Sequence, residues 1–165
     1  MNRKTYTILA AAVLVLAAFF ALEYAGPALA RSDAEPVVTS GGIELDDVAA
    51  QTRQFIAWEQ EIELTPEQEQ IRVEALSAIP APCCSDNTAA TCCCPCNMAR
   101  SVWGLSKHLI VEKRAGVEEV RQAAQDWFHF INPDGFSGDV CYTGGCNRAF
   151  HENGCGGMNK DHPVT

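Results

Sequence analysis

Apolar residues recur at helical spacing in two stretches of the second half of the chain. The cleaner stripe predicts a helix over residues 117–131 and consists of Val117, Val120, Ala124, Trp127, Phe128 and Ile131. The other predicts a helix that begins at about Cys96 or Asn97 and has the stripe Met98, Val102, Leu105 and Leu109. Gly116 is expected to end this helix, and the turn at residues 132–135 to end the other. Both stripes are interpreted as core positions.

The apolar pattern is weaker in the first half. An approximate apolar face predicts a helix from Ile43 to about Gln60. The run Thr65-Pro66-Glu67-Gln68 is a capping box with proline at the first helical position, and it predicts a second helix that Pro80 stops. The four helices predict a mostly α fold, a small bundle of three to four helices without an internal repeat.

Two irregular segments remain outside these helices. The loop from Pro82 to Asn97 (PCCSDNTAATCCCPCN) holds six of the nine cysteines. Beyond Gly135 the chain is rich in glycine and cysteine and has no apolar periodicity, so this C-terminal tail cannot build a core of its own. If the tail is ordered, its cysteines and His151 are the expected means of tying it down.

The N-terminus has the pattern of an export signal. Arg3 and Lys4 precede an apolar run at residues 8–22, and Ala28-Leu29-Ala30 offers a cleavage site, which predicts a signal peptide over residues 1–30. An uncleaved membrane anchor at 8–22 is the alternative. Residues 31–42 are interpreted as a linker, and residues 43–165 as a single helical cysteine-rich domain. We expect the protein to be exported, periplasmic or extracellular.

The net charge of −9 argues against nucleic acid and anionic lipid as partners. Membrane contact is therefore expected only through the N-terminal segment, if it stays uncleaved. Residues 31–80 carry eleven acids and three bases. This acidic half is interpreted as a solvated face or, alternatively, as a docking surface for a basic protein partner.

The spacing of the cysteines limits how they can pair. Adjacent cysteines such as Cys83 and Cys84 rarely bond to each other, so each needs a more distant partner or a metal. Three tail thiols bridged to three loop thiols would leave three loop cysteines free, and an odd total of nine leaves at least one unpaired. Disulfides, a redox pair and a metal site all stay open on this evidence.

Thiols at Cys93-Cys94-Pro95-Cys96 lie at the predicted start of a helix. The partial positive charge there stabilises thiolates, and thiolates select soft ions such as Cu(I) or Zn(II). Our leading hypothesis is that copper or zinc is bound without catalytic turnover by loop thiolates: Cys93, Cys94 and Cys96 first, then Cys83, Cys84 and Cys92. The alternative is a thiol–disulfide oxidoreductase with Cys93 and Cys96 as its redox pair. A third possibility is a disulfide-stapled interaction module.

The tail has a ligand set of its own. Its spacing is C-x4-C-x4-H-x3-C, and three thiols with one imidazole are a common structural zinc set. These residues are a second candidate site, or else disulfide partners of the loop: Cys141, Cys146, His151 and Cys155.

The order of features in residues 76–131 is a helix ending at Ile79-Pro80, a cysteine-dense loop, a C-x-x-C opening a helix, Gly116, and Val120-Arg121. This order resembles the bacterial exported proteins named for a P-C-Y-C-G-C motif, with PCCSDN and TCCCPC standing in place of the hexapeptide. The resemblance implies a helical fold and metal handling, copper being the usual suggestion. The C-x-x-C before a helix is also similar to the thiol-oxidoreductase subunit of bacterial cytochrome c maturation, which implies the redox role of Cys93 and Cys96.

Overall fold

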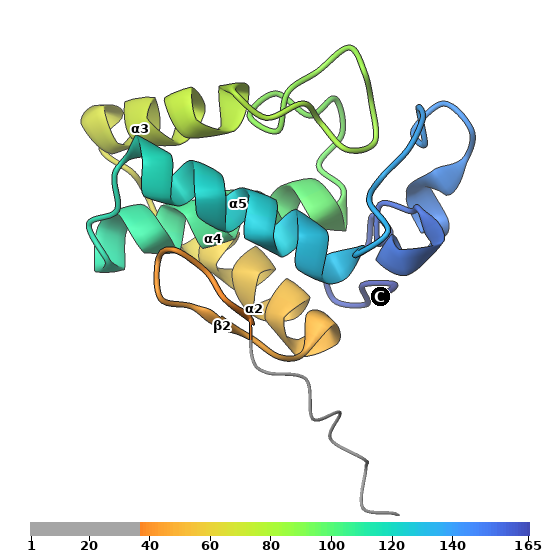
Figure 1. Cartoon of the computed structure of the whole chain (residues 1–165), viewed down its shortest axis with the longest axis horizontal. Coiled ribbons are helices and arrows are strands. Elements are labelled where there is room, and N and C mark those ends of the chain that lie inside the picture. The colour runs from red at the N-terminus through yellow and green to blue at the C-terminus, as the bar shows by residue number, and fades with distance from the viewer. Residues whose placement is uncertain (1–36) are drawn as a thin grey trace, which may run out of the picture. The chain divides into compact units, whose positions relative to one another are not determined.

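The computed structural model of the chain describes residues 37–165 (Figure 1). The expected signal peptide or anchor and the first half of the linker lie outside the described residues. Four helices dominate the described part and confirm the mostly α fold. In chain order the elements are β1 (Val37–Val38), β2 (Glu44–Leu45), α2 (Val48–Glu61), α3 (Pro66–Ser77), α4 (Asn97–Glu112), α5 (Val117–Ile131), and the single 3-10 turns η1 (Gly145–Asn147) and η2 (Phe150–Glu152).

A short hairpin precedes α2. Strands β1 and β2 pair antiparallel, Val37 with Leu45, so the first paired residues lie within the stretch expected to be linker. The prediction that a helix begins at Ile43 was wrong by five residues. Asp47 is extended and its carboxylate accepts a hydrogen bond from the Ala50 N–H, so the helix begins only after it. Leu45, which has helical spacing relative to Val48, lies on β2 instead.

The start of α3 confirms the capping box read from the sequence. Thr65 Oγ1 accepts from the Gln68 N–H, and the Gln68 side chain accepts from the Thr65 N–H at 3.0 Å. The helix ends at Ser77, just before Pro80. This end delivers the chain into the cysteine loop.

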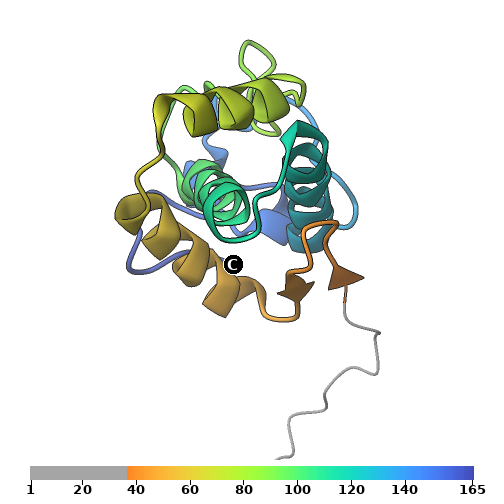
Figure 2. The same ribbon diagram turned by 90° about the vertical axis from the view of Figure 1, so that its left-hand side faces the viewer.

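Helix α4 lies at the centre of the bundle and contacts α2, α3 and α5 (Figure 2). Gly104 permits a close approach to α2, since a Cβ there would overlap the Phe55 carbonyl oxygen and lie 2.7 Å from the carbonyl carbon. The prediction that Gly116 ends α4 was wrong. Arg114 adopts the left-handed conformation (φ 55°) after the helix, whereas Gly116 is extended and precedes α5, where its N–H donates to the Glu119 carboxylate.

The core confirms the two apolar stripes. Trp127 is fully buried and packs edge-to-face against Phe55. Its indole N–H donates to Ser101 Oγ at 3.0 Å. The stripe of α4 is buried throughout. No helix within residues 37–165 is both long and apolar enough to span a membrane.

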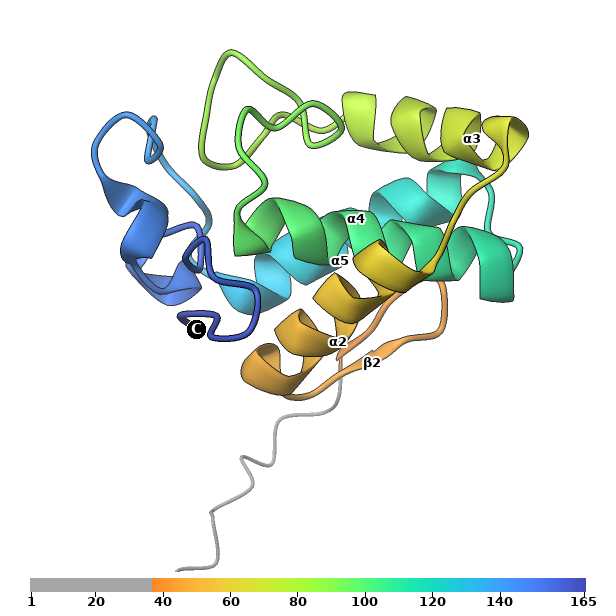
Figure 3. The same cartoon turned by 180° about the vertical axis from the view of Figure 1, so that it is seen from behind.

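The cysteine loop and the C-terminal tail lie side by side at the end of the bundle where α4 begins (Figures 1 and 3). A backbone hydrogen bond from the Cys141 N–H to the Cys83 carbonyl, 3.0 Å long, joins them directly. This end of the molecule therefore gathers all nine cysteines.

Candidate thiolate metal centre

The tail is held against the first turn of α4 by backbone hydrogen bonds. The first N–H groups of a helix have no partner within the helix, and the side chain of the N-cap residue Cys96 does not satisfy them through a capping hydrogen bond. Instead the Asn97 N–H donates to the Gly157 carbonyl (2.9 Å) and the Met98 N–H donates to the Cys155 carbonyl (3.1 Å). The tail thus acts as the cap of α4, and Cys155 is placed beside Cys96.

Asn97 adds a side-chain clamp to this junction. It is fully buried, and its Nδ2 donates to the carbonyls of Gly156 (2.8 Å) and Asn159 (2.9 Å). Its Oδ1 has no hydrogen-bond partner among the described residues. The sequence analysis missed Asn97, although a helix start next to a cysteine motif was a signal that a side chain there would matter.

A second attachment joins the tail to the other end of the loop. Asp139 accepts from the Ser85 N–H (2.8 Å), and the Tyr142 hydroxyl donates to Asp86 (2.9 Å). Phe150 fills the space beneath the tail and is fully buried. Hydrogen bonds and one aromatic anchor therefore tie the tail down, in addition to any bond its cysteines form.

Four cysteines meet at the base of this junction and are called here the inner group: Cys83, Cys92, Cys96 and Cys155. The sulfurs of Cys83, Cys96 and Cys155 all lie within 4.8 Å of one another, and all three side chains are buried. Cys92 Sγ lies 3.7 Å from Cys83 Sγ, and Cys92 also interacts with Cys96. The ligand positions come from the start of the loop, its end, the N-cap of α4 and the tail.

A second set lies nearer the surface and is called here the outer group: Cys93, Cys94 and Cys141, with Cys84 beside them. Cys141 Sγ lies 3.6 Å from Cys94 Sγ and 3.8 Å from Cys93 Sγ. Cys93 is exposed and the other two are half-buried. Cys84 is buried and interacts with Cys93.

Two of the three adjacent cysteine pairs in the loop are divided between the groups, whereas Cys93 and Cys94 share the outer one. Cys83 belongs to the inner group and Cys84 to the outer, and the same split separates Cys92 from Cys93. Neighbouring cysteines rarely bond to each other, and this division lets each of the two separated pairs supply both groups.

Hydrogen bonding and burial give the thiols different acidities. The pKa of Cys96 is lowered, because the thiols of Cys155, Cys83 and Cys92 donate to its sulfur and the Ala99 N–H of the first helical turn also contributes. The pKa of Cys83 is raised by its hydrogen bonds to Cys155, Cys92 and Cys96, and the bond to Cys155 is the largest cause. Cys96 is therefore the preferred thiolate of the inner group.

Cys84, beside the outer group, and Cys94, within it, differ in acidity. The pKa of Cys84 is lowered, chiefly by the hydrogen bond that Asn87 Nδ2 donates to its sulfur at 3.3 Å. Burial raises the pKa of Cys94 to about 12. The inner group thus combines a stabilised thiolate with weakly acidic thiols, and binding of a cation at either group would displace thiol protons.

The remaining predicted site residues lie apart from these sets. Cys146 is half-buried near Cys155, and His151 is exposed on η2, so the four residues of the tail zinc set do not gather among themselves. Cys141 and Cys155 join loop thiols instead. The proposed redox pair is also divided, with Cys93 in the outer group and Cys96 in the inner group.

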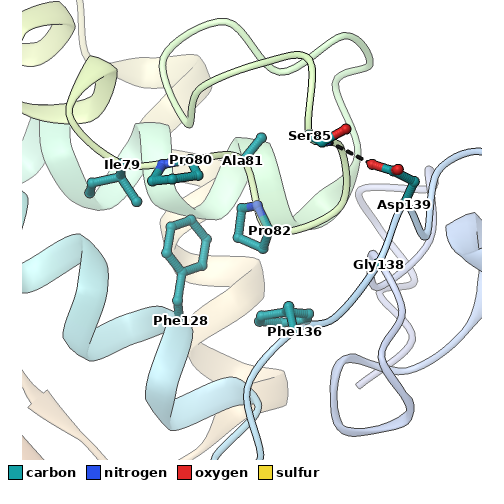
Figure 4. Close-up of a pocket in the computed structure, with 9 residues that line it drawn as sticks. All are labelled: Ile79, Pro80, Ala81, Pro82, Ser85, Phe128, Phe136, Gly138 and Asp139. Carbon is teal, nitrogen blue, oxygen red and sulfur yellow. Dashed lines mark hydrogen bonds between the residues drawn. The ribbon is translucent and has the colours of Figure 1, made fainter.

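An open pocket of about 430 Å³ lies beside the cysteine loop (Figure 4). Phe128 and Phe136 face the Pro80–Pro82 segment across it. The Ser85–Asp139 hydrogen bond closes its rim. Its lining includes no cysteine or histidine, and it combines residues of the loop with residues of the tail.

Comparison with protein-family models, with curated proteins and with solved structures finds no match for this chain. The chemistry of the site therefore rests on its own geometry. Both cysteine groups can hold a metal ion.

Proposed function

We propose that this protein is an exported metal-binding protein that holds a soft ion, copper or zinc, through the thiolates of the inner and outer groups. The observation that carries the proposal is that the cysteine thiols converge. Thiols from separate segments of the chain meet in two sets, and none of the nine cysteines of the described part forms a disulfide.

The separations within each set suit a shared ion. Thiolates bound to one tetrahedral zinc at about 2.3 Å lie about 3.8 Å from each other. The sulfur pairs within the two groups lie 3.6 to 3.8 Å apart where hydrogen-bonding contacts connect them. Two sulfurs in van der Waals contact have a similar spacing, so the meeting of three or four sulfurs at one point supports the metal more than any single pair does.

The donor set favours a soft ion. Both groups consist of cysteine alone. Thiolates select Cu(I) and Zn(II), whereas Mg²⁺ and Ca²⁺ require oxygen ligands. An all-sulfur set therefore supports copper or zinc over hard cations.

The geometry weighs against the two alternatives. A thiol–disulfide oxidoreductase needs its two cysteines together and its attacking thiol accessible, but Cys96 is fully buried and belongs to a different group from Cys93. A disulfide needs only one partner per thiol, whereas Cys141 and Cys155 each lie near at least two loop thiols. Metal binding uses all of these contacts at once.

Export, and membership of the family named for the P-C-Y-C-G-C motif, are part of the same proposal. Both rest on sequence features, the first on residues 1–30 and the second on the order of features in residues 76–131. A bound ion would also protect thiols in an oxidising compartment, where unprotected pairs form disulfides.

The test compares the native and denatured masses of the full exported chain after loading with zinc or with Cu(I) under anaerobic conditions. The wild type is expected to carry an excess mass of metal ions in the native spectrum only. The double variant Cys83→Ser/Cys141→Ser removes one ligand from each group and is expected to lose the metal. Cys146→Ser is the matched control and is expected to keep it.

A different result would reject the proposal. It fails if the native chain shows no metal excess and the denatured chain lacks two hydrogens for each of four disulfides. Equal metal content in the double variant and the wild type would reject it as well. Helical circular dichroism of each variant separates loss of ligand from loss of fold.

A further inference from the structure

We propose that the two groups are separate sites with different roles: the inner group holds a permanent zinc ion that fastens the tail to α4, and the outer group holds an exchangeable Cu(I) ion. This inference rests on the proposed function and divides it between two sets of residues.

The inner group has the properties of a closed site. It offers four thiols, and Cys83, Cys96 and Cys155 have 0% of their surface exposed. Structural zinc sites are four-coordinate and closed, with no position left for a further ligand. Buried ligands also make exchange slow, because neither a chelator nor a partner thiol can reach the ion before the tail detaches.

The position of the inner group links its ion to folding. Cys96 is the N-cap of α4, and the Cys155 carbonyl already accepts the Met98 N–H. An ion between these two sulfurs would fasten the tail where its hydrogen bonds also hold it. Metal binding and tail docking should therefore be thermodynamically coupled.

The outer group has the properties of an open site. Its three sulfurs converge within 4.8 Å, and the exposed Cys93 lies at its rim. Cu(I) accepts two or three thiolates, whereas zinc requires a fourth ligand. An incoming thiol can reach an ion held at this rim, form a bond to it and displace one of the three protein thiolates. Such a transfer changes no oxidation state, since each thiol that binds releases a proton and each that leaves takes one up.

The division of Cys83 from Cys84 and of Cys92 from Cys93 keeps the two ligand sets distinct. Loading one set leaves the other with its own thiols, because no cysteine needs to serve both. The groups are nonetheless adjacent, since Cys94 lies close enough to Cys96 and Cys92 for their charges to act on it. A single polynuclear copper–thiolate cluster is therefore the rival arrangement that the experiment must distinguish.

The three tail cysteines provide a matched set of variants. Cys141→Ser removes an outer ligand, Cys155→Ser removes an inner ligand, and Cys146→Ser changes a cysteine of neither group. Each full-length protein is loaded with one equivalent of zinc and then titrated anaerobically with Cu(I) against a Cu(I)-specific chelator. Native mass gives the stoichiometry, and hydrogen exchange of the Met98 N–H reports whether the tail is docked.

The wild type is expected to bind one zinc that resists a moderate chelator, and to take its first equivalent of Cu(I) without releasing it. Cys141→Ser should keep the zinc and the protected Met98 N–H but lose at least about 100-fold in Cu(I) affinity, more than the 10- to 100-fold typical of changes outside the ligand shell. Cys155→Ser should lose the zinc and the protection. Cys146→Ser should match the wild type in both respects.

Cys92→Ser keeps the test decisive if Cys155→Ser does not fold. Cys92 is half-buried on the loop, and its backbone takes no part in the hydrogen bonds that dock the tail on α4, so this variant should fold and still lose chelator-resistant zinc. The proposal is overturned if the first equivalent of Cu(I) expels the zinc, or if Cys141→Ser and Cys155→Ser lose both ions alike. Absence of every metal from the wild type would instead reject the proposed function itself.

Discussion

Asn97 is the side chain that most directly connects the fold to the candidate site. Its amide donates to the carbonyls of Gly156 and Asn159 at 2.8 and 2.9 Å. Replacing it by alanine removes both hydrogen bonds, each contributing about 1 kcal/mol net. The Gly156 carbonyl keeps its bond from the Val164 N–H (2.9 Å), so no further cost arises from leaving it unpaired.

The expected loss for Asn97→Ala is therefore about 2 kcal/mol, a roughly 30-fold shift towards the state with the tail detached. Hydrogen exchange of the Met98 N–H measures this shift directly, because that N–H donates to the Cys155 carbonyl only when the tail is docked. Urea unfolding of the same metal-free protein gives the global stability. The detached tail also carries Cys155 away, so affinity for an ion at the inner group should fall by up to the same factor.

Asn97→Asp separates two explanations. An acidic residue in the first turn stabilises a helix by about 0.3–1 kcal/mol through the helix dipole. An ionised aspartate, however, has no N–H to donate to the two tail carbonyls. If Asn97 acts as a clamp, the aspartate variant should expose the Met98 N–H at least as much as alanine does. Protection equal to the wild type would refute the clamp and leave Asn97 as an ordinary polar residue at a helix start.

Gly104→Ala should lower the free energy of unfolding in urea by about 2 kcal/mol, because overlap with the Phe55 backbone outweighs a gain of about 1 kcal/mol in helix propensity. An unchanged urea midpoint would contradict this close contact. Thr65→Ala should cost about 1 kcal/mol by removing the cap of α3, and Thr65→Ser should recover most of it. Burial lowers the pKa of His108, which stacks on Trp58. Protonation therefore favours the unfolded chain, and stability should fall as pH drops below 6.5. His108→Gln should flatten that fall between pH 7.5 and 5.5, and an identical slope in the variant would assign it to other groups.

Local signals predicted the helices well. The capping box at Thr65 and the stripes of α4 and α5 act over neighbouring turns, so the sequence contains all the information they need. The errors lie at boundaries where a nonlocal partner decides. Leu45 fits a helical stripe, but its pairing with Val37 makes it part of a strand. Arg114 rather than Gly116 takes the left-handed position after α4.

The candidate site shows the same difference between local signals and nonlocal partners more clearly. The sequence predicted thiol chemistry at the cysteine loop, because nine cysteines cannot all pair and adjacent ones rarely bond to each other, and soft-metal binding was its leading hypothesis. The sequence did not indicate which cysteines would group together in space. Cys93 and Cys96 form the obvious pair along the chain, yet they belong to different groups, and each group is completed by a cysteine from the tail.

The sequence by itself therefore determined which residues are candidates for the site and which helices lie beside them, since both follow from side-chain type and local spacing. Only the tertiary structure decided which sulfurs meet. The tail returns across more than forty residues to cap α4, and it does so through backbone carbonyls and the buried Asn97 amide. Backbone carbonyls are present at every residue, so no pattern of side chains along the chain indicates which of them will meet the first turn of α4.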